Sequence, residues 1–213
     1  MSTVAELILV IPVLLLSLSI HEYSHGKMAD LLGDPTPRAT GRLTLNPLAH
    51  LDLMGTLVLL MTRRFGWAKP VQVNPRYFSN PRRDMMYVGM AGPASNFVQA
   101  TIFALVFRIF QVPSVANALY NFGGFQLMMV VSNFFFLAII VNLALGVFNL
   151  IPVPPLDGSR ILVGILPRQY EPFFRQLEGW GMFIILFLAL TGILGRVILP
   201  FVNIFARLLG VPI

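Results

Sequence analysis

The chain has 213 residues, no cysteine and a formal net charge of +6. Hydrophobic residues make up 56% of it and charged residues only 11%, whereas soluble domains usually carry about 25% charged residues. This composition excludes a disordered chain, a coiled coil and a disulfide scaffold, and it predicts an integral membrane protein with one domain over residues 1–213. The excess of arginine comes with no basic helix or aromatic platform, so we attribute it to loops at the membrane surface and expect no nucleic-acid partner.

Apolar segments long enough to cross a bilayer set the expected architecture. A spanning helix needs about 17 to 25 predominantly apolar residues. The segment 51–62 is too short and is expected to be re-entrant or interfacial, and the apolar tail is ambiguous. The segments expected to cross are 5–32, 84–110, 127–150 and 179–195.

The distribution of charge tests this arrangement. If the segment 51–62 crossed, the two arginines of 36–48 would lie opposite the six cations of the loop 63–83. If it does not cross, both groups share one side with the arginines of 151–176, and the uncharged turn 111–126 lies opposite. The second arrangement obeys the positive-inside rule and places the N-terminus outside.

We therefore predict an all-α polytopic membrane protein with about four spanning helices and one short re-entrant or interfacial element. Five or six spans are the alternative. Small extended segments are expected at 39–45 and 69–73. Both lie on the expected cytoplasmic side, where they either capture an unwound substrate by strand addition or are plain interfacial loops.

A metal-binding pattern ends the first expected crossing. His21-Glu22-Tyr23-Ser24-His25 matches H-E-x-x-H. On a helix, residues i and i+4 lie on one face, so both imidazoles can bind one metal ion. Glu22 lies beside them, where a carboxylate can accept a proton from a metal-activated water. The pattern predicts a zinc hydrolase with one zinc ion per chain.

The depth of this pattern in the bilayer supports a functional role. A helix from Ala5 to His21 rises about 24 Å, which places His21, Glu22 and His25 within the membrane near its cytoplasmic face. Ionisable groups at such a depth are costly unless they are paired or bound to a metal, and they usually mark a functional site.

A catalytic zinc site normally has a third protein ligand. Asp157 is one candidate, because it follows an uncharged crossing and a proline-rich approach that returns the chain to the cytoplasmic side. His50 is the rival, although it is more easily interpreted as an interfacial residue or as a partner of the ligands. A site of two imidazoles and one carboxylate also suits iron or cobalt.

Several motifs together resemble the site-2 protease family of intramembrane zinc metalloproteases. The motifs cover most of the chain, occur in the family's order and are typical of a compact prokaryotic branch without PDZ or CBS domains. They are His21 to His25, Gly41 to Pro47, Gly66 to Val71, Ala91 to Asn96 and Asn149 to Gly158.

This resemblance implies His21, His25 and Asp157 as zinc ligands and Glu22 as general base. It also implies that the protein is a membrane endopeptidase that cleaves membrane-spanning protein substrates inside the lipid bilayer of a prokaryotic cell membrane. The alternative function is a metal transporter or a membrane metal-binding protein without hydrolysis.

Four further polar residues are candidates for substrate binding or for support of the ligands. Asn96 and Asn142 are polar residues within expected crossings, where an interhelical hydrogen bond is the other interpretation. The resemblance places Asn149 near the active site and the substrate. His50 completes this group of candidates.

Overall fold

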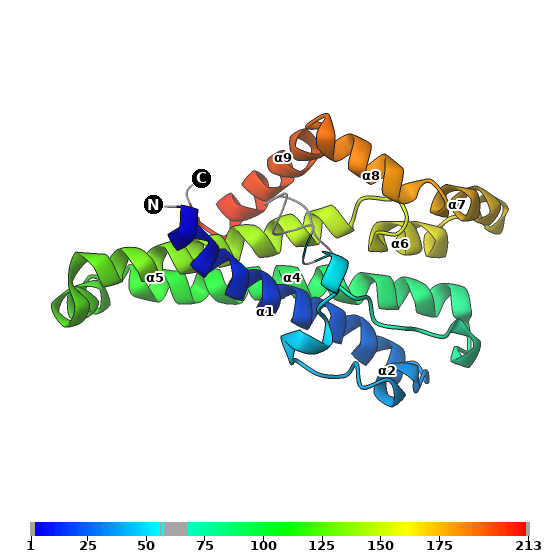
Figure 1. Ribbon diagram of the computed structural model, residues 1–213, viewed down its shortest axis with the longest axis horizontal. Helices are drawn as coiled ribbons and strands as arrows, with labels where there is room; N and C mark the ends of the chain where they lie inside the picture. The colour runs from blue at the N-terminus through cyan, green and yellow to red at the C-terminus, as the bar shows by residue number, and fades with distance from the viewer. Residues whose placement is uncertain (1–2, 56, 58–67, 212–213) are drawn as a thin grey trace.

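The computed structural model describes residues 3–55, 57 and 68–211, with side chains described from residue 8 onward (Figure 1). Within these residues the protein is helical and has no β-strand, which confirms the all-α prediction. The element expected at 51–62 lies largely outside the described residues. Its flanks are paired, because Leu51 and Ala68 form an isolated antiparallel bridge.

Three helices are long and apolar enough to span a membrane. They are α1 (Thr3–Leu31), α4 (Pro81–Phe110) and α5 (Pro113–Asn149). α4 packs against both of the others. α5 begins earlier than predicted, because Pro113 favours a helix start and residues 113–123 are helical where a turn was expected. Gly124, with a left-handed φ of 69°, then breaks the helix.

The remaining helical elements are short. The predicted extended segment at 39–45 is wrong in its first part, because Ala39 ends a helix that Pro37 helps to start, and Gly41 turns the chain with a φ of 69°. Residues 69–73 form neither helix nor strand. The short elements are α2 (Thr36–Ala39), η1 (Pro47–Ala49), η2 (Pro75–Tyr77), α6 (Asp157–Ile165), η3 (Arg168–Tyr170), α7 (Glu171–Glu178), α8 (Gly181–Leu190) and α9 (Ile193–Leu208).

The last predicted crossing, 179–195, is broken in the structure. η3 and α7 together are bent by 67° from α8, and this pair is a fourth candidate span. Gly192, with a φ of 74°, separates α8 from α9. α9 then packs against α5, and Arg108 near the end of α4 donates to the Leu209 carbonyl at 2.6 Å. About four crossings therefore agree with the prediction.

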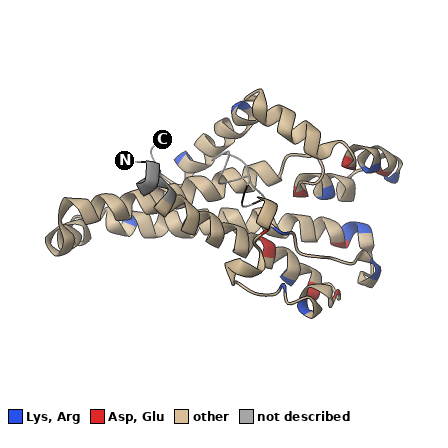
Figure 2. Cartoon of the chain, in the orientation of Figure 1, with Lys and Arg blue, Asp and Glu red and all other residues tan. Residues whose placement is uncertain are grey.

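Most charged residues lie at one end of the molecule (Figure 2). We call it the charged end; it contains the end of α1, the start of α4, and α2, α6 and α7 (Figures 1 and 2). The largest apolar core joins α4, α5 and α9, and its buried residues include Ala100, Ile139, Leu143 and Val202. The asymmetry of charge agrees with the predicted collection of basic loops on one side.

Candidate metal centre

Two histidines on α1 form the first half of the site. His21 and His25 are 3% and 5% exposed, and their Nε2 atoms lie 2.9 Å apart. Their spacing of four residues puts both rings on one helix face. That face is turned towards α4, since both rings have partners there.

Asp157, the first residue of α6, completes the group. Its Oδ2 lies 3.2 Å from Nε2 of His21 and 3.2 Å from Nε2 of His25. The preceding segment 150–156 contains three prolines, which prevent α5 from continuing and allow the chain to return towards α1. Within the described part of the chain, these three residues form the one group of potential metal ligands whose atoms all lie within 4.8 Å of one another.

The hydrogen-bond partners of His25 assign its ring tautomer. Nδ1 of His25 lies 2.6 Å from the Val88 carbonyl oxygen. A carbonyl can only accept, so Nδ1 carries the proton. In the neutral ring, Nε2 is then unprotonated and directs its lone pair towards His21 and Asp157.

A chain of amide groups assigns the tautomer of His21 in the same way. Asn142 Nδ2 donates to the Ala138 carbonyl at 2.9 Å, which leaves its Oδ1 to accept from Asn96 Nδ2 at 3.0 Å. Asn96 Oδ1 therefore accepts from His21 Nδ1 at 2.6 Å. Asn96 and Asn142 are both fully buried. This series of hydrogen bonds begins at the Ala138 carbonyl, which cannot donate, so Nδ1 of His21 carries a proton. In the neutral ring, Nε2 of His21 is then also unprotonated.

When both rings are neutral, the three atoms that face one another are therefore all acceptors. Such a buried arrangement is unfavourable without a cation. In a tetrahedral zinc site with bonds of about 2.0–2.1 Å, neighbouring ligand atoms lie about 3.3 Å apart. The spacings of 2.9 and 3.2 Å among His21, His25 and Asp157 come close to this value. The residues present therefore fit a zinc ion.

Gly92 on α4 allows the two rings to approach. A Cβ atom added there would lie 2.5 Å from Cε1 of His25 and 2.6 Å from Cε1 of His21, closer than real Cβ contacts allow. Gly158 has a similar role beside the third ligand, since a Cβ there would overlap the backbone of Leu150 and Ile151. The site therefore depends on close backbone approach at two glycines.

Glu22 is held by the main chain of another segment. The Val71 N–H donates to Glu22 Oε2 at 2.9 Å. That segment is fixed further along by Asn74 N–H, which donates to the fully buried Asp34 at 2.7 Å. Glu22 is thus oriented by a backbone amide, with its second carboxylate oxygen left for other partners.

Two of the sequence candidates form hydrogen bonds to other parts of the chain. Asn149, the last residue of α5, donates to the Leu145 carbonyl of its own helix at 2.9 Å. His50 is buried, and its Nε2 lies 2.8 Å from the Thr44 carbonyl oxygen, so it supports the loop between α2 and η1.

Sequence reasoning did not identify the Val88 carbonyl, the Val71 amide or the role of Gly92. The first two are backbone groups and have no sequence signature. A glycine four residues before Asn96 in a spanning helix is a detectable sign of close helix approach.

Comparisons with known proteins relate the chain to a group of peptidases. The family model described as Peptidase family M50 matches residues 9–192. YwhC of Bacillus subtilis, provisionally named a zinc metalloprotease, is 38% identical over 191 residues, which cover 89% of this chain and 84% of that protein. Rip2 of Mycolicibacterium smegmatis, also provisionally named a zinc metalloprotease, is 32% identical over 201 residues, which cover 92% of this chain and 72% of that protein. A zinc metalloprotease of Methanocaldococcus jannaschii is 33% identical over 42% of this chain and 22% of its own length. No solved structure matches the chain.

Proposed function

The chain belongs to peptidase family M50, the site-2 protease family, and from this we propose that it is an intramembrane zinc metalloendopeptidase with His21, His25 and Asp157 as ligands of one zinc ion. It hydrolyses peptide bonds in membrane-embedded segments of protein substrates. One observation supports the ligand assignment: three buried potential ligand atoms, from His21 and His25 on α1 and Asp157 on α6, lie within 4.8 Å of one another.

The protein's own residues supply the proton transfers and the geometry. When bound, zinc acts as a Lewis acid that makes a water molecule more acidic and polarises the scissile carbonyl. Glu22 accepts the proton from the attacking water and passes it to the leaving amine nitrogen as the C–N bond breaks. The Val71 amide holds one oxygen of Glu22 and so directs the other towards the reaction. Asn96 and Asn142 position His21, whereas a role of Asn149 in substrate binding stays a prediction.

The charged end is assigned to the cytoplasmic face of a prokaryotic cell membrane. The positive-inside rule supports this assignment, because basic residues gather at this end (Figure 2). The related proteins named above come from two bacteria and an archaeon. The metal centre lies between α1 and the start of α6, on the side of the charged end, and hydrolysis requires that water reach it from the cytoplasm.

The test compares purified wild type with Glu22→Gln and Asp157→Ala. Wild type is expected to contain one zinc ion per chain and to cleave a model membrane helix. Glu22→Gln should keep zinc and lose about 10²- to 10⁴-fold in cleavage rate. Asp157→Ala should lose both zinc and activity, measured by metal analysis of the same samples.

Each contrary result has a defined meaning. Full cleavage by Glu22→Gln would remove Glu22 from the mechanism. Wild-type zinc affinity in Asp157→Ala would remove Asp157 from the ligand set. Wild type that binds zinc but cleaves no membrane helix would favour the alternative of a metal-binding or metal-transporting protein.

A further inference from the structure

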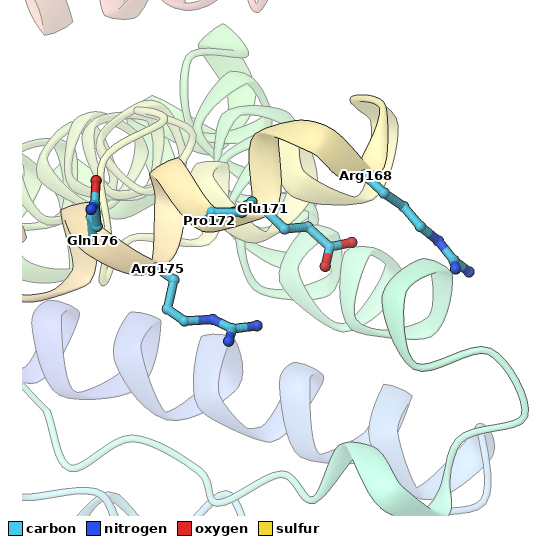
Figure 3. Close-up of a pocket in the computed structure, with 5 residues that line it drawn as sticks. All are labelled: Arg168, Glu171, Pro172, Arg175 and Gln176. Carbon is cyan, nitrogen blue, oxygen red and sulfur yellow. The ribbon is translucent and has the colours of Figure 1, made fainter.

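A hollow separate from the metal ligands lies along α7 at the charged end. It consists of two adjoining cavities of about 400 and 520 Å³ that share Glu171 and Arg175. Arg168 and Arg175 extend from the same side of this short helical segment, with Glu171 between them (Figure 3). The larger cavity continues between the start of α4 and α6 and reaches Ser159 and Arg160.

The lining of this hollow has an excess of positive charge. Glu171 is paired with Arg82, whose Nε lies 3.3 Å from Glu171 Oε1. Within the described residues, neither Arg168 nor Arg175 forms an ion pair. The charged residues of the lining are Arg82, Arg160, Arg168, Arg175, Glu171 and Glu178. Four guanidinium groups against two carboxylates favour an anionic occupant.

The neighbouring aromatic residues place the hollow at the level of lipid headgroups. Phe174 is buried, whereas Tyr170, Phe173 and Trp180 are 45%, 58% and 68% exposed. Exposed aromatic residues of this kind, tyrosine and tryptophan above all, concentrate at membrane–water interfaces. The strongly apolar α8 leaves α7 at an angle of 67°, as a span that starts from an interfacial helix would.

We propose that this hollow binds the phosphodiester headgroup of an anionic membrane lipid. Arg168 and Arg175 hold the phosphate, since guanidinium groups match phosphate oxygens in geometry and charge, and the acyl chains lie beside α8. Arg160 Nη1, at the inner end of the cavity, lies 3.6 Å from Asp157 Oδ1. The bound lipid therefore rests against the helix that carries Asp157. This inference goes beyond the proposed function and does not depend on it.

The experiment measures lipid preference through Trp180, which lies next to α7. The chain has two tryptophans, so Trp67→Phe leaves Trp180 as the reporter. The full chain is placed in phosphatidylcholine vesicles that contain increasing amounts of brominated phosphatidylglycerol, which quenches a nearby indole. We expect an apparent preference for phosphatidylglycerol of about tenfold or more. The double variant Arg168→Gln/Arg175→Gln should lose most of it.

Arg76→Gln is the matched control, because Arg76 is an exposed arginine at the same end that does not line either cavity. It should keep the preference within about twofold. An equal loss in both variants, or no preference in wild type, would overturn the proposal. Displacement of the lipid by inorganic phosphate at similar concentration would assign the hollow to a soluble anion and would also overturn it. The helical circular dichroism signal, measured on every sample, should stay unchanged and shows that each variant is folded.

Discussion

At the scale of single residues, the site depends on one hydrogen bond that determines which nitrogen of His21 faces the ligand group. Asn96→Leu removes the acceptor for Nδ1–H and leaves the ring free to rotate or change tautomer. Loss of such a supporting partner typically costs about 10- to 100-fold in metal affinity. We expect this loss in a competition titration against a zinc chelator.

Asn142 provides the internal control for the same prediction, because it acts on His21 only through Asn96. Asn142→Leu should weaken zinc binding less than Asn96→Leu does. In the Asn96→Leu background it should add no further loss. Additive losses of zinc affinity would show that Asn142 acts on the site by another route. Wild-type zinc affinity in Asn96→Leu would show that the Asn96–His21 hydrogen bond does not support zinc binding.

Gly92 supplies a second prediction at this scale. Gly92→Ala places a methyl group where the imidazole rings of His21 and His25 lie, so the rings must move apart and zinc binding should be lost. Gly195→Ala is the matched control, because a Cβ there meets nothing within 4 Å and alanine favours a helix by about 1 kcal/mol over glycine. Metal analysis and thermal unfolding of both variants check this, and retained zinc in Gly92→Ala would contradict it.

At the scale of elements, the segment 69–73 runs past Glu22 and holds its carboxylate in one orientation. Val71→Pro removes the N–H that holds Glu22 Oε2, and a carboxylate without this bond adopts other orientations. We expect a lower kcat with zinc content unchanged. Gln72→Pro is the control, since Gln72 is exposed and no bond from its amide to a described residue is found. Equal losses of kcat in both variants would assign the effect to stiffening of the segment.

Hydropathy predicted the existence of the membrane-spanning helices better than the residues at which they begin and end. The crossing expected at 84–110 corresponds to α4, which begins at Pro81 because Asn80 accepts the Arg83 N–H there and caps the helix. The last crossing was expected to be continuous, but the left-handed Gly192 divides it. Composition indicates that a segment is apolar enough to enter a membrane, whereas the point at which it breaks depends on individual glycines and on packing.

The proposed metal ligands His21 and His25 could be identified from sequence because their signature is local. H-E-x-x-H is a local pattern, and its chemistry follows from helix geometry. The prediction of Asp157 also depended on the predicted topology, because only the return of the chain after α5 brings this residue to His21 and His25. The two histidines are held by the Val88 carbonyl and by the hydrogen bonds from Asn142 and Asn96, whereas Glu22 is held by the Val71 amide. Contacts of backbone groups depend on tertiary structure, so the identity of a residue in the sequence does not predict them.

At the scale of the whole molecule, the number of crossings determines where the C-terminus lies. α1, α4 and α5 account for three crossings. The chain returns from α7 at the charged end to Leu209, whose carbonyl accepts from Arg108 near the opposite end of α4. The bent pair of α7 and α8 therefore begins a fourth, broken crossing that α9 continues, and the start of α1 lies with Leu209 on the side away from the charged end (Figure 1).

Single cysteines test this arrangement directly, because the chain has no cysteine of its own. With the N-terminus outside, Leu208→Cys, at an exposed position in the last turn of α9, should react with a membrane-impermeant thiol reagent in intact cells. Tyr120→Cys, in the first part of α5, should react in the same way. Arg76→Cys at the charged end should react only after the membrane is opened, since its loop lies on the cytoplasmic side. If Leu208→Cys behaved like Arg76→Cys, α8 and α9 would form a hairpin that returns to the cytoplasm, and the fourth crossing would be lost while the metal site on α1 and α6 would stand unchanged.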